Sequence, residues 1–487
     1  MYRSKVFSHT YLDASEGVSC IPALNPKSGR AACPTPPKEG NKPICQLPKG
    51  NEKMNVKKMV KTAAIAAILG TGFVPSAYAD VSVEDVKCTQ RYPWNGLVDI
   101  EYTIACDDPE AEIYVNPVGF NGDTGLTVFP THFTGDGATN TVKAGKHTMV
   151  WDAKADLGNT FATKNFQIKM YAGKKLSRYI VIDISGGTNA TSYAVRHSIE
   201  GPNLADDTCR TTEIWMRLIP PGTFMMGSPE DELGRSDNED LHKVTITKPY
   251  YMGVFEVTQR QWELVKGGNP SYRKGNTRPV ENINFNEMYN SGLNQNNYWE
   301  QSPHESVSKD SFMGLIRSKT RQQGFDLPTE AQWEHSCRAG TQASLYSGEY
   351  LMGTNGCANL NRLGCNFSNA DKTAKVGTYQ PNGYGLYDMY GNTREWCKDG
   401  YVAHLGHTNT EDVCSGKIVV SSGYSSSTYG MVARGGSFAS PSRECRSAAR
   451  FCWEFLYGGT SSGRYFANLY KDKEVGFRLC CTGNLQQ

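Results

Sequence analysis

The sequence lacks several features that would assign it to a class at once. Its 487 residues carry 51 Lys and Arg against 49 Asp and Glu. No basic stripe or arginine-rich tail is present, so we expect no nucleic-acid partner. No P-loop or HExxH motif occurs, so neither a nucleotide-binding loop nor a zinc-protease helix is predicted. What is present is abundant glycine, at 49 residues, with 11% aromatics, a composition typical of a loop-rich fold.

An export signal is the first positive feature. Residues 54–79 begin with a lysine-rich stretch, continue with an apolar run from Ala63 to Val74 and end in a small-x-small cleavage motif. The run is shorter than the roughly 20 residues of a membrane-spanning helix. We therefore expect cleavage between Ala79 and Asp80, export to the periplasm or the extracellular space, and no membrane span in the mature chain. A short buried helix is the alternative.

Residues 1–53 precede this signal and are rich in proline and glycine. Because a signal peptide normally starts a protein, we expect translation to begin at Met54 and residues 1–53 to be a gene-model extension. A disordered leader is the alternative.

Cysteine usage points to disulfides. Fifteen cysteines occur, of which three lie in residues 1–53 and twelve in residues 80–487. An even count in an exported chain favours disulfides over metal binding. Cys88 with Cys106, and Cys357 with Cys365, are plausible local pairs, although spacing does not fix the connectivity.

Short alternating segments dominate residues 80–186. The segment 96–106 alternates apolar and polar residues, and segments such as 146–154 are further short strands between Gly, Asn and Asp turns. This pattern predicts an all-β sandwich of the immunoglobulin or fibronectin type. Residues 187–210 are polar and weakly periodic and are predicted to be a linker.

A second domain is predicted over residues 211–482. Thr258 with Gln261, and Thr329 with Gln332, have capping-box spacing and predict two short helices. The rest of this domain consists of turns and short strands, so we expect irregular structure and disulfides to hold it together.

Seven motifs of this domain occur in a fixed order. They are GTFMMGS, YYMGVFEVTQRQWE, RPVENINFNE, FDLPTEAQWEHSCRAGT, VGTYQPNGYGLYDMYGNTREWCKD, ARGGSFASPSRECRSAAR and VGFRLC. Together they resemble the sulfatase-modifying-factor family, whose best-known member is the formylglycine-generating enzyme. The resemblance implies a C-type-lectin-like α+β fold with little regular structure. For the oxidising members it also implies conversion of a sulfatase cysteine by O2 and copper.

Two cysteine thiolates close together hold the copper in those members, and thiolates suit soft Cu(I). The family's pair follows the GGS-aromatic motif, where this chain has only Cys445. Cys452 lies seven residues further on and does not match the pair. We therefore name no catalytic residue and keep Cys445 and Cys452 as weak candidates.

Calcium is the inorganic ligand that the resemblance implies. The positions matching a structural Ca2+ site of the family are Asp388, Gly391, Thr393 and Glu395. Carboxylate and carbonyl oxygens are the donors that Ca2+ prefers. A tight turn whose acids bind backbone N–H groups is the alternative. The weaker matches for a second site are Asn359, Leu360, Asp371 and Thr373.

A ligand groove is expected next to the sequence AARF. The aromatic candidates are Trp453, Phe455 and Tyr457, which could stack on a sugar or grip a peptide, with ordinary packing as the alternative. Arg446 is a further groove candidate. His404 and His407 are interpreted as surface residues.

These observations lead to one function and one alternative. We expect an exported, non-oxidising binding or accessory module for a glycan or protein ligand, with structural calcium. The alternative is a formylglycine-generating oxidoreductase that acts on a protein cysteine and requires copper.

Overall fold

The structure is a computed structural model that describes residues 81–92, 95–123, 127–158, 165–289, 307–401, 404–405, 410–411, 430–454 and 471–482. All of them belong to one compact unit, Val74–Gln487. The predictions for residues 1–53 and 54–79 lie outside the described residues.

The N-terminal region consists of two antiparallel sheets. One has the order β1-β2-β6-β5 and the other the order β4-β3-β7. Their bounds are β1 Val81–Gln90, β2 Leu97–Cys106, β3 Tyr114–Asn121, β4 Thr127–Val128, β5 Phe133–Gly135, β6 Gly145–Asp152 and β7 Phe166–Gly173, with the short helix α2 at Ala153–Leu157 after β6.

The two N-terminal sheets share one apolar core. Ile100 and Tyr102 of β2 and Trp151 of β6 are buried in the same cluster as Val115 of β3. In β2 the buried positions alternate with more exposed ones, because successive side chains of a strand point to opposite faces. The alternation in the sequence therefore identified the strands correctly.

Three further sheets build the rest of the described chain. Their orders are β14-β20-β13-β10-β8-β9, β11-β12-β16 and β18-β17-β15-β19. The bounds are β8 Tyr179–Asp183, β9 Ala194–Ser198, β10 Glu213–Ile219, β11 Gly222–Met226, β12 His242–Ile246, β13 Tyr250–Gly253, β14 Phe325–Asp326, β15 Arg394–Gly400, β16 Thr410–Glu411, β17 Gly430–Arg434, β18 Arg450–Glu454, β19 Val475–Gly476 and β20 Cys480–Cys481.

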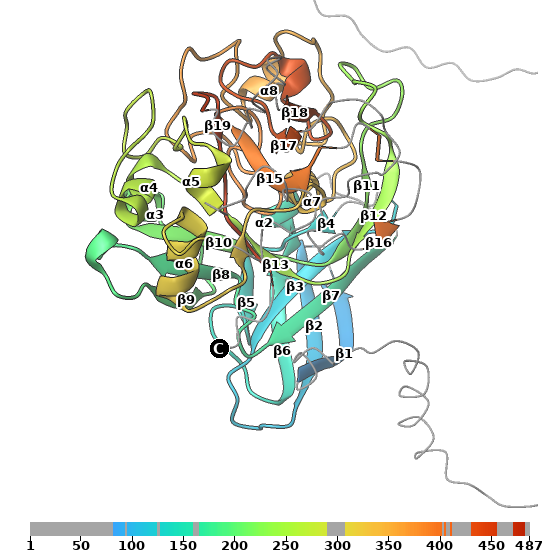
Figure 1. The fold of residues 1–487 in the computed structure, drawn as a ribbon. Helices are drawn as coiled ribbons and strands as arrows, with labels where there is room; N and C mark the ends of the chain where they lie inside the picture. The colour runs from blue at the N-terminus through green and yellow to red at the C-terminus, as the bar shows by residue number, and fades with distance from the viewer. Residues whose placement is uncertain are drawn as a thin grey trace, which may run out of the picture. The chain divides into compact units, whose positions relative to one another are not determined.

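Short helices accompany these sheets, so the content is mixed α and β. The helices are α3 Thr208–Thr211, α4 Gln259–Lys266, α5 Phe285–Tyr289, α6 Phe312–Thr320, α7 Glu330–Arg338 and α8 Ala358–Asn361, with 3-10 turns η2 Gly187–Asn189 and η3 Ser442–Glu444. The helix α7 lies against β15 and β17 (Figure 1).

Both predicted capping boxes are present. The Thr258 side chain accepts a hydrogen bond from the Gln261 backbone N–H, and the Gln261 side chain accepts one from the Thr258 N–H. Thr329 and Gln332 repeat this arrangement at the start of α7. Such boxes satisfy N–H groups that a helix leaves unpaired in its first turn.

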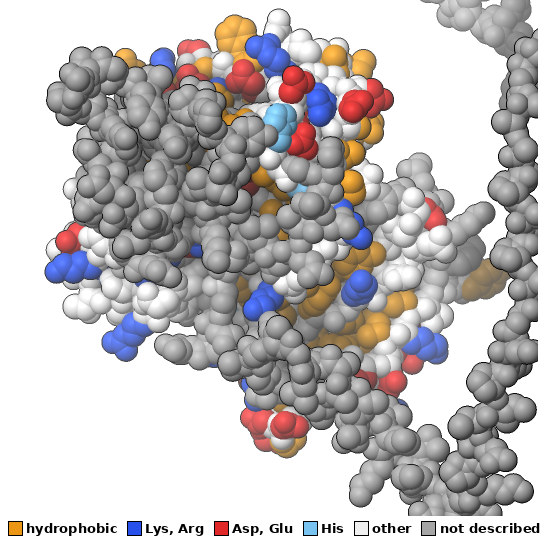
Figure 2. Space-filling model, turned by 45° about the vertical axis from the view of Figure 1, so that its right-hand side comes forward, with side chains coloured by type: hydrophobic (Ala, Val, Ile, Leu, Met, Phe, Trp, Pro, Cys, Tyr) orange, Lys and Arg blue, Asp and Glu red, His pale blue; other side chains and the backbone are white. Residues whose placement is uncertain are grey.

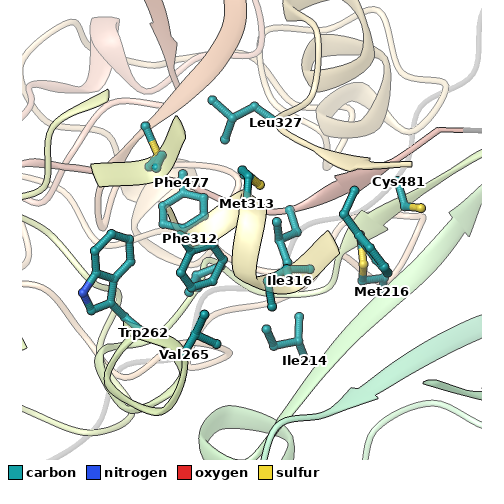
Figure 3. Packing of buried hydrophobic residues seen from close by; sticks show 14 of the residues in the cluster. Ile214, Met216, Trp262, Val265, Phe312, Met313, Ile316, Leu327, Phe477 and Cys481 are labelled. Carbon is teal, nitrogen blue, oxygen red and sulfur yellow. The ribbon is translucent and has the colours of Figure 1, made fainter. Parts of the chain in front are cut away.

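An aromatic stack anchors the helices to the six-stranded sheet. Trp262 of α4 lies parallel to Phe312 of α6, with ring centroids 5.2 Å apart. Phe477 meets Phe312 edge to face at 5.1 Å. Figure 3 shows these rings beside Ile214 and Met216 of β10. Such pairs are worth about 0.5–1.5 kcal/mol beyond the area that they bury.

The segment 187–210, expected as a linker, contains regular structure. Its strand β9 pairs with β8, and β8 pairs with β10. Residues 179–198 therefore belong to the six-stranded sheet of the second region. The segment is polar because β9 is an edge strand whose residues alternate between exposed and half-buried. In a single sequence such a strand is hard to distinguish from a loop.

The expected disulfide between Cys88 and Cys106 is wrong. In the β1–β2 hairpin Cys88 lies opposite Ile100, whereas Cys106 lies opposite Val81. This register separates the two cysteines by roughly 20 Å at about 3.3 Å per residue, well beyond the reach of a disulfide. Both are free thiols, as are Cys357 and Cys365. The adjacent Cys480 and Cys481 face two different apolar clusters.

The surface shows no separation of charge on the face drawn in Figure 2. Described Lys and Arg side chains are interspersed there with Asp and Glu. Within the described ranges, every helix is too short or too polar to cross a bilayer.

Candidate functional site

The candidate site is the loop that follows β17. Gly435 and Gly436 have φ of 90° and 73°, a conformation that favours glycine. A Cβ at Gly436 would lie 2.5 Å from Cys445 Sγ and 2.9 Å from the Glu444 carbonyl oxygen. The two glycines therefore let the chain turn tightly against η3 and bring Cys445 beneath the loop.

Cys445 has the environment of a core residue. Its side chain is fully buried, and burial raises the pKa of its thiol to about 12. Burial therefore favours the protonated thiol at neutral pH, whereas nucleophilic attack uses the thiolate.

Cys452 does not converge with Cys445. Cys452 of β18 lies opposite Val432 of β17, whereas Cys445 contacts Gly436, four residues along the chain from Val432. Cys452 therefore lies within the β17–β18 ladder, whereas Cys445 lies beneath the turn that follows β17. Among the described residues, no group of three His, Cys, Asp or Glu side chains could hold a metal ion.

A polar network that the sequence did not predict stabilises the loop that follows β17. Arg394 donates to Ser440 Oγ over 2.8 Å and to Glu444 over 2.9 Å. Its other terminal nitrogen donates to Glu474 over 2.7 Å, and Ser437 Oγ donates to the same carboxylate over 2.7 Å. Glu474 lies 80 residues from Arg394 and 37 residues from Ser437 in the sequence. No local motif therefore connects these residues.

A pocket of about 220 Å³ opens beside this loop. Its wall contains four arginines but only two carboxylates. The charged lining residues are Arg394, Arg434, Arg443, Arg450, Glu239 and Glu444. Guanidinium groups therefore dominate the charged part of the lining, and three of them pair with carboxylates that lie outside the pocket.

Arg434 supplies a hydrogen-bond donor that no described group uses. The side chain is 1% exposed, and its Nε has no hydrogen-bond partner. The nearest carboxylate oxygen, from Glu330, lies 3.6 Å away, too far for a good hydrogen bond. A buried donor of this kind is costly unless a ligand or water meets it.

Arg443 is the accessible arginine of the pocket. Its side chain is 47% exposed and donates to Asn355 Oδ1 over 2.8 Å. Arg450, by contrast, is held by both oxygens of Glu330, over 2.6 and 2.9 Å.

Arg446 is not a groove residue. Its guanidinium is fully buried and donates to Glu232 and Glu239 and to the Gly234 carbonyl. These contacts fix irregular backbone more than 200 residues away in sequence. Arg446 is therefore a buried residue whose guanidinium holds neighbouring backbone and carboxylates.

The aromatic groove candidates are described only in part. Phe455 and Tyr457 lie outside the described residues. Of Trp453 only the backbone is described, in β18 opposite Met431. Phe451 lines the pocket instead, with the Arg394 guanidinium 4.4 Å above its ring.

Asp388 has the properties expected of a calcium ligand. Its φ is 57°, and its Oδ2 accepts a hydrogen bond from the Gly377 N–H over 2.6 Å. Its Oδ1 is buried and has no partner. Burial raises the pKa of this carboxyl to about 6. A cation would relieve both the burial of the charge and the missing contact.

Glu395 fits a calcium ion less well. Its two oxygens accept hydrogen bonds from Arg478 and from Trp333 Nε1. It would have to release Arg478 to bind a metal. Thr393 donates its N–H and hydroxyl to Glu256, whose pKa is raised by burial and by the nearby Asp388 and Glu395 charges. The Gly391 N–H donates to the Gly435 carbonyl over 2.8 Å, so this turn is tied to the candidate site.

The weaker set of calcium positions is only partly brought together. Thr373 is buried, and its Oγ1 has no partner, while Asp371 is exposed. Asn359 donates to the Tyr350 carbonyl over 3.4 Å, and Leu360 is in the apolar core.

His404 and His407 are predicted to lie at the surface, and the structure describes His404. His404 is 57% exposed and lies 3.3 Å from Asp240. His407 lies outside the described residues.

Comparison with known proteins identifies the second region. Residues 202–454, just over half of the chain, match the model of the sulfatase-modifying factor enzyme 1-like domain. The chaperone protein LppX of Paenibacillus barcinonensis is 30% identical over 174 residues, which are 30% of this chain and 61% of that protein.

Two further proteins are similar over about half of the chain. The formylglycine-generating enzyme of Mus musculus is 26% identical over 254 residues, covering 45% of this chain and 68% of that enzyme. The solved structure of Treponema denticola variable protein 1 is 26% identical, with a TM-score of 0.38, and the match covers 55% of this chain and 95% of that one. The chain thus spans between three-fifths and about two-thirds of the length of these two curated relatives. It belongs to the family of the sulfatase-modifying factor enzyme 1-like domain.

Proposed function

We propose that this protein is a non-oxidising binding or accessory module of its family. The observation that carries this proposal is the environment of Cys445. Copper-dependent oxidation requires two thiolates on one metal, and here the loop presents one buried thiol with its pKa raised to about 12. The name of the mouse relative favours the alternative, a formylglycine-generating oxidoreductase with copper. That alternative needs a second thiolate beside Cys445.

The arginine-lined pocket supports binding of an anionic group. Arg443 is accessible at its rim, and the Arg434 Nε–H at its floor is unmatched. Carboxylate and sulfate groups accept charge-assisted hydrogen bonds from guanidinium groups. We propose that the ligand is a protein or glycan that presents such a group.

Calorimetric titration of the full chain tests this proposal with two probes, a short acidic peptide and a sulfated disaccharide. We expect one probe to bind and Arg443→Gln to weaken its binding about tenfold, which corresponds to one charge-assisted hydrogen bond. Arg362→Gln is the matched control, because Arg362 is also an exposed arginine paired with a carboxylate and does not line the pocket. Equal weakening by both variants, or no binding of either probe, would contradict the proposal.

We also propose a structural Ca2+ at Asp388, with carbonyl oxygens of Gly391 and Thr393 as further donors. The support is the buried, unpartnered Asp388 Oδ1 and the preference of Ca2+ for oxygen ligands. Glu395 would complete the set only by exchanging Arg478 for the ion. The weaker set of Asn359, Leu360, Asp371 and Thr373 has support only from the unpartnered Thr373 Oγ1.

Export and the finer fold assignments complete the proposal. We infer export, with the signal at residues 54–79, from the sequence alone. The two N-terminal sheets around one core support an immunoglobulin-like or fibronectin-like sandwich. The short helices and sparse strands of residues 211–482 support the C-type-lectin-like arrangement that the family implies.

A further inference from the structure

Two arginines meet in a small cavity between the N-terminal sheets and the six-stranded sheet. Asn116, Val118 and Phe129 line it from the N-terminal side. Arg178 and Arg217 line it from the other side. The backbone fixes this meeting, because the Leu218 N–H donates to the Arg178 carbonyl over 2.9 Å.

Both guanidinium groups keep unused donors. Arg178 Nη2 and Arg217 Nε are buried, and neither has a hydrogen-bond partner. Arg217 is only 6% exposed. The Arg217 Nη1 donates to the Arg178 carbonyl over a long 3.5 Å. Unmatched buried N–H groups are rare in folded proteins and call for a ligand.

Neither guanidinium forms an ion pair with a described carboxylate. The nearest carboxylate that influences Arg178 is Asp156, whose oxygens are used by Thr131, His132 and the Trp151 indole. Buried charges are normally paired, so this arrangement is incomplete as an all-protein site.

Aromatic rings offset part of this charge. Arg217 lies between the rings of Phe129 and Tyr179, at 5.2 and 4.9 Å. Arg178 lies 5.4 Å from the Phe133 ring. Cation–π contacts engage the faces of the guanidinium groups and leave their N–H edges free. The rings therefore orient the donors without satisfying them.

The cavity is small. Its volume is about 10 Å³, about the space that one water-sized or monatomic species needs. A water molecule would accept from both donors but would leave two like charges uncompensated. A monatomic anion meets both requirements.

We propose that Arg178 and Arg217 together bind one chloride ion between the N-terminal sheets and the six-stranded sheet. The ion accepts hydrogen bonds from Arg178 Nη2 and Arg217 Nε and neutralises part of their combined charge. It thereby stabilises the packing of Phe129 and Val118 against β10.

The pKa of Arg178 agrees with this assignment. Burial, and then the charge of Arg217, lower it to about 10, so the arrangement without an anion penalises the charged form. Two groups act in the opposite direction. Tyr179 and Asp156 both raise the pKa of Arg178.

Thermal unfolding of the full chain in two sodium salts tests the proposal. Chloride and gluconate are compared at equal ionic strength, since gluconate is too large for the cavity. A ligand that binds only the folded state raises Tm as its concentration rises, and we expect a rise of about 2 °C or more at a hundredfold excess over Kd. The same Tm in both salts would overturn the proposal.

Two variants separate the site from general salt effects. Arg178→Met removes one of the paired charges and should abolish the difference between the salts. Arg196→Met is the matched control, because Arg196 is 48% exposed and lies 4.9 Å from the Trp215 ring. It should keep the full chloride response. Loss of the response in both variants would contradict a site at Arg178.

Crystals grown in sodium bromide give a readout that does not depend on variant folding. Bromide resembles chloride in size and charge and scatters X-rays anomalously. An anomalous peak within hydrogen-bond reach of Arg178 Nη2 and Arg217 Nε is the expected result. A water molecule or an empty cavity at that place would refute the proposal.

Discussion

Glu334 is the carboxylate that pairs with the buried Arg338 and Arg434 at the candidate site. It is fully buried and pairs with two arginines, Arg338 over 2.8 Å and Arg434 in a shorter contact. Its Oε1 also accepts the Gly227 N–H over 2.9 Å. Arg434 in turn donates to the carbonyl groups of Ala448 and Ala449, which lie between the loop and β18.

Replacing Glu334 with Gln keeps the shape of the side chain but removes its charge. One terminal atom of the amide becomes an N–H donor that faces a guanidinium, so at least one buried hydrogen bond is lost. Removing one partner of a buried ion pair costs about 3–5 kcal/mol, because the remaining charge is left uncompensated. Two arginines share this carboxylate, so we expect E334Q at the upper end of that range.

Urea unfolding at pH 7 measures this loss. Glu263→Gln is the matched control, because Glu263 forms an exposed i,i+3 pair with Arg260 on α4, and such pairs are worth under about 1 kcal/mol. The free energy of unfolding should fall by at least 3 kcal/mol more in E334Q than in E263Q, with a similar m-value. A loss below about 1 kcal/mol in E334Q would refute the role assigned to this carboxylate.

Three further predictions follow from buried groups. His335 is buried, and burial lowers its pKa from 6.5 to about 4. The folded state therefore loses stability as the pH falls from about 6.5 to 4. The loss in the free energy of unfolding is at most about 3 kcal/mol. Urea unfolding of His335→Asn across that range should show a flatter profile, and an unchanged slope would contradict this cause. Gly436→Ala should lower the free energy of unfolding by at least about 2 kcal/mol, because of the positive φ and the contact with Cys445. Gly268→Ala is the control and should not lose this stability, because Gly268 has open space around it. Equal melting temperatures of the two variants would disprove the tight turn. Added Ca2+ should raise the Tm of the wild type, and Asp388→Asn should abolish this rise; a rise retained in D388N would exclude this site.

Features encoded over short distances could be predicted from the sequence. The capping boxes at Thr258 and Thr329 depend on residues three positions apart, and the alternation in residues 97–106 on neighbours two apart. Both patterns are visible in one chain without an alignment. The family followed from seven such local motifs in order, and the matched domain model confirms it.

Features set by long-range pairing could not be predicted. The strand β9 pairs with β8, and β8 pairs with β10 of the second region, whereas residues 194–198 alone resemble a linker. The same holds for Arg446, whose partners Glu232 and Glu239 lie more than 200 residues away. A buried arginine and an exposed one have the same letter in the sequence, so groove and core roles could not be separated.

The most direct test of the central claim is a mass measurement on a substrate peptide. The reduced full chain is incubated with Cu(I), O2 and a short sulfatase peptide that contains the target cysteine. We expect the peptide cysteine to remain unmodified, because the loop after β17 presents one buried thiol, that of Cys445, where the family's oxidising members have two. Conversion of that cysteine to formylglycine by the wild type, and its loss in Cys445→Ser, would contradict the non-oxidising function.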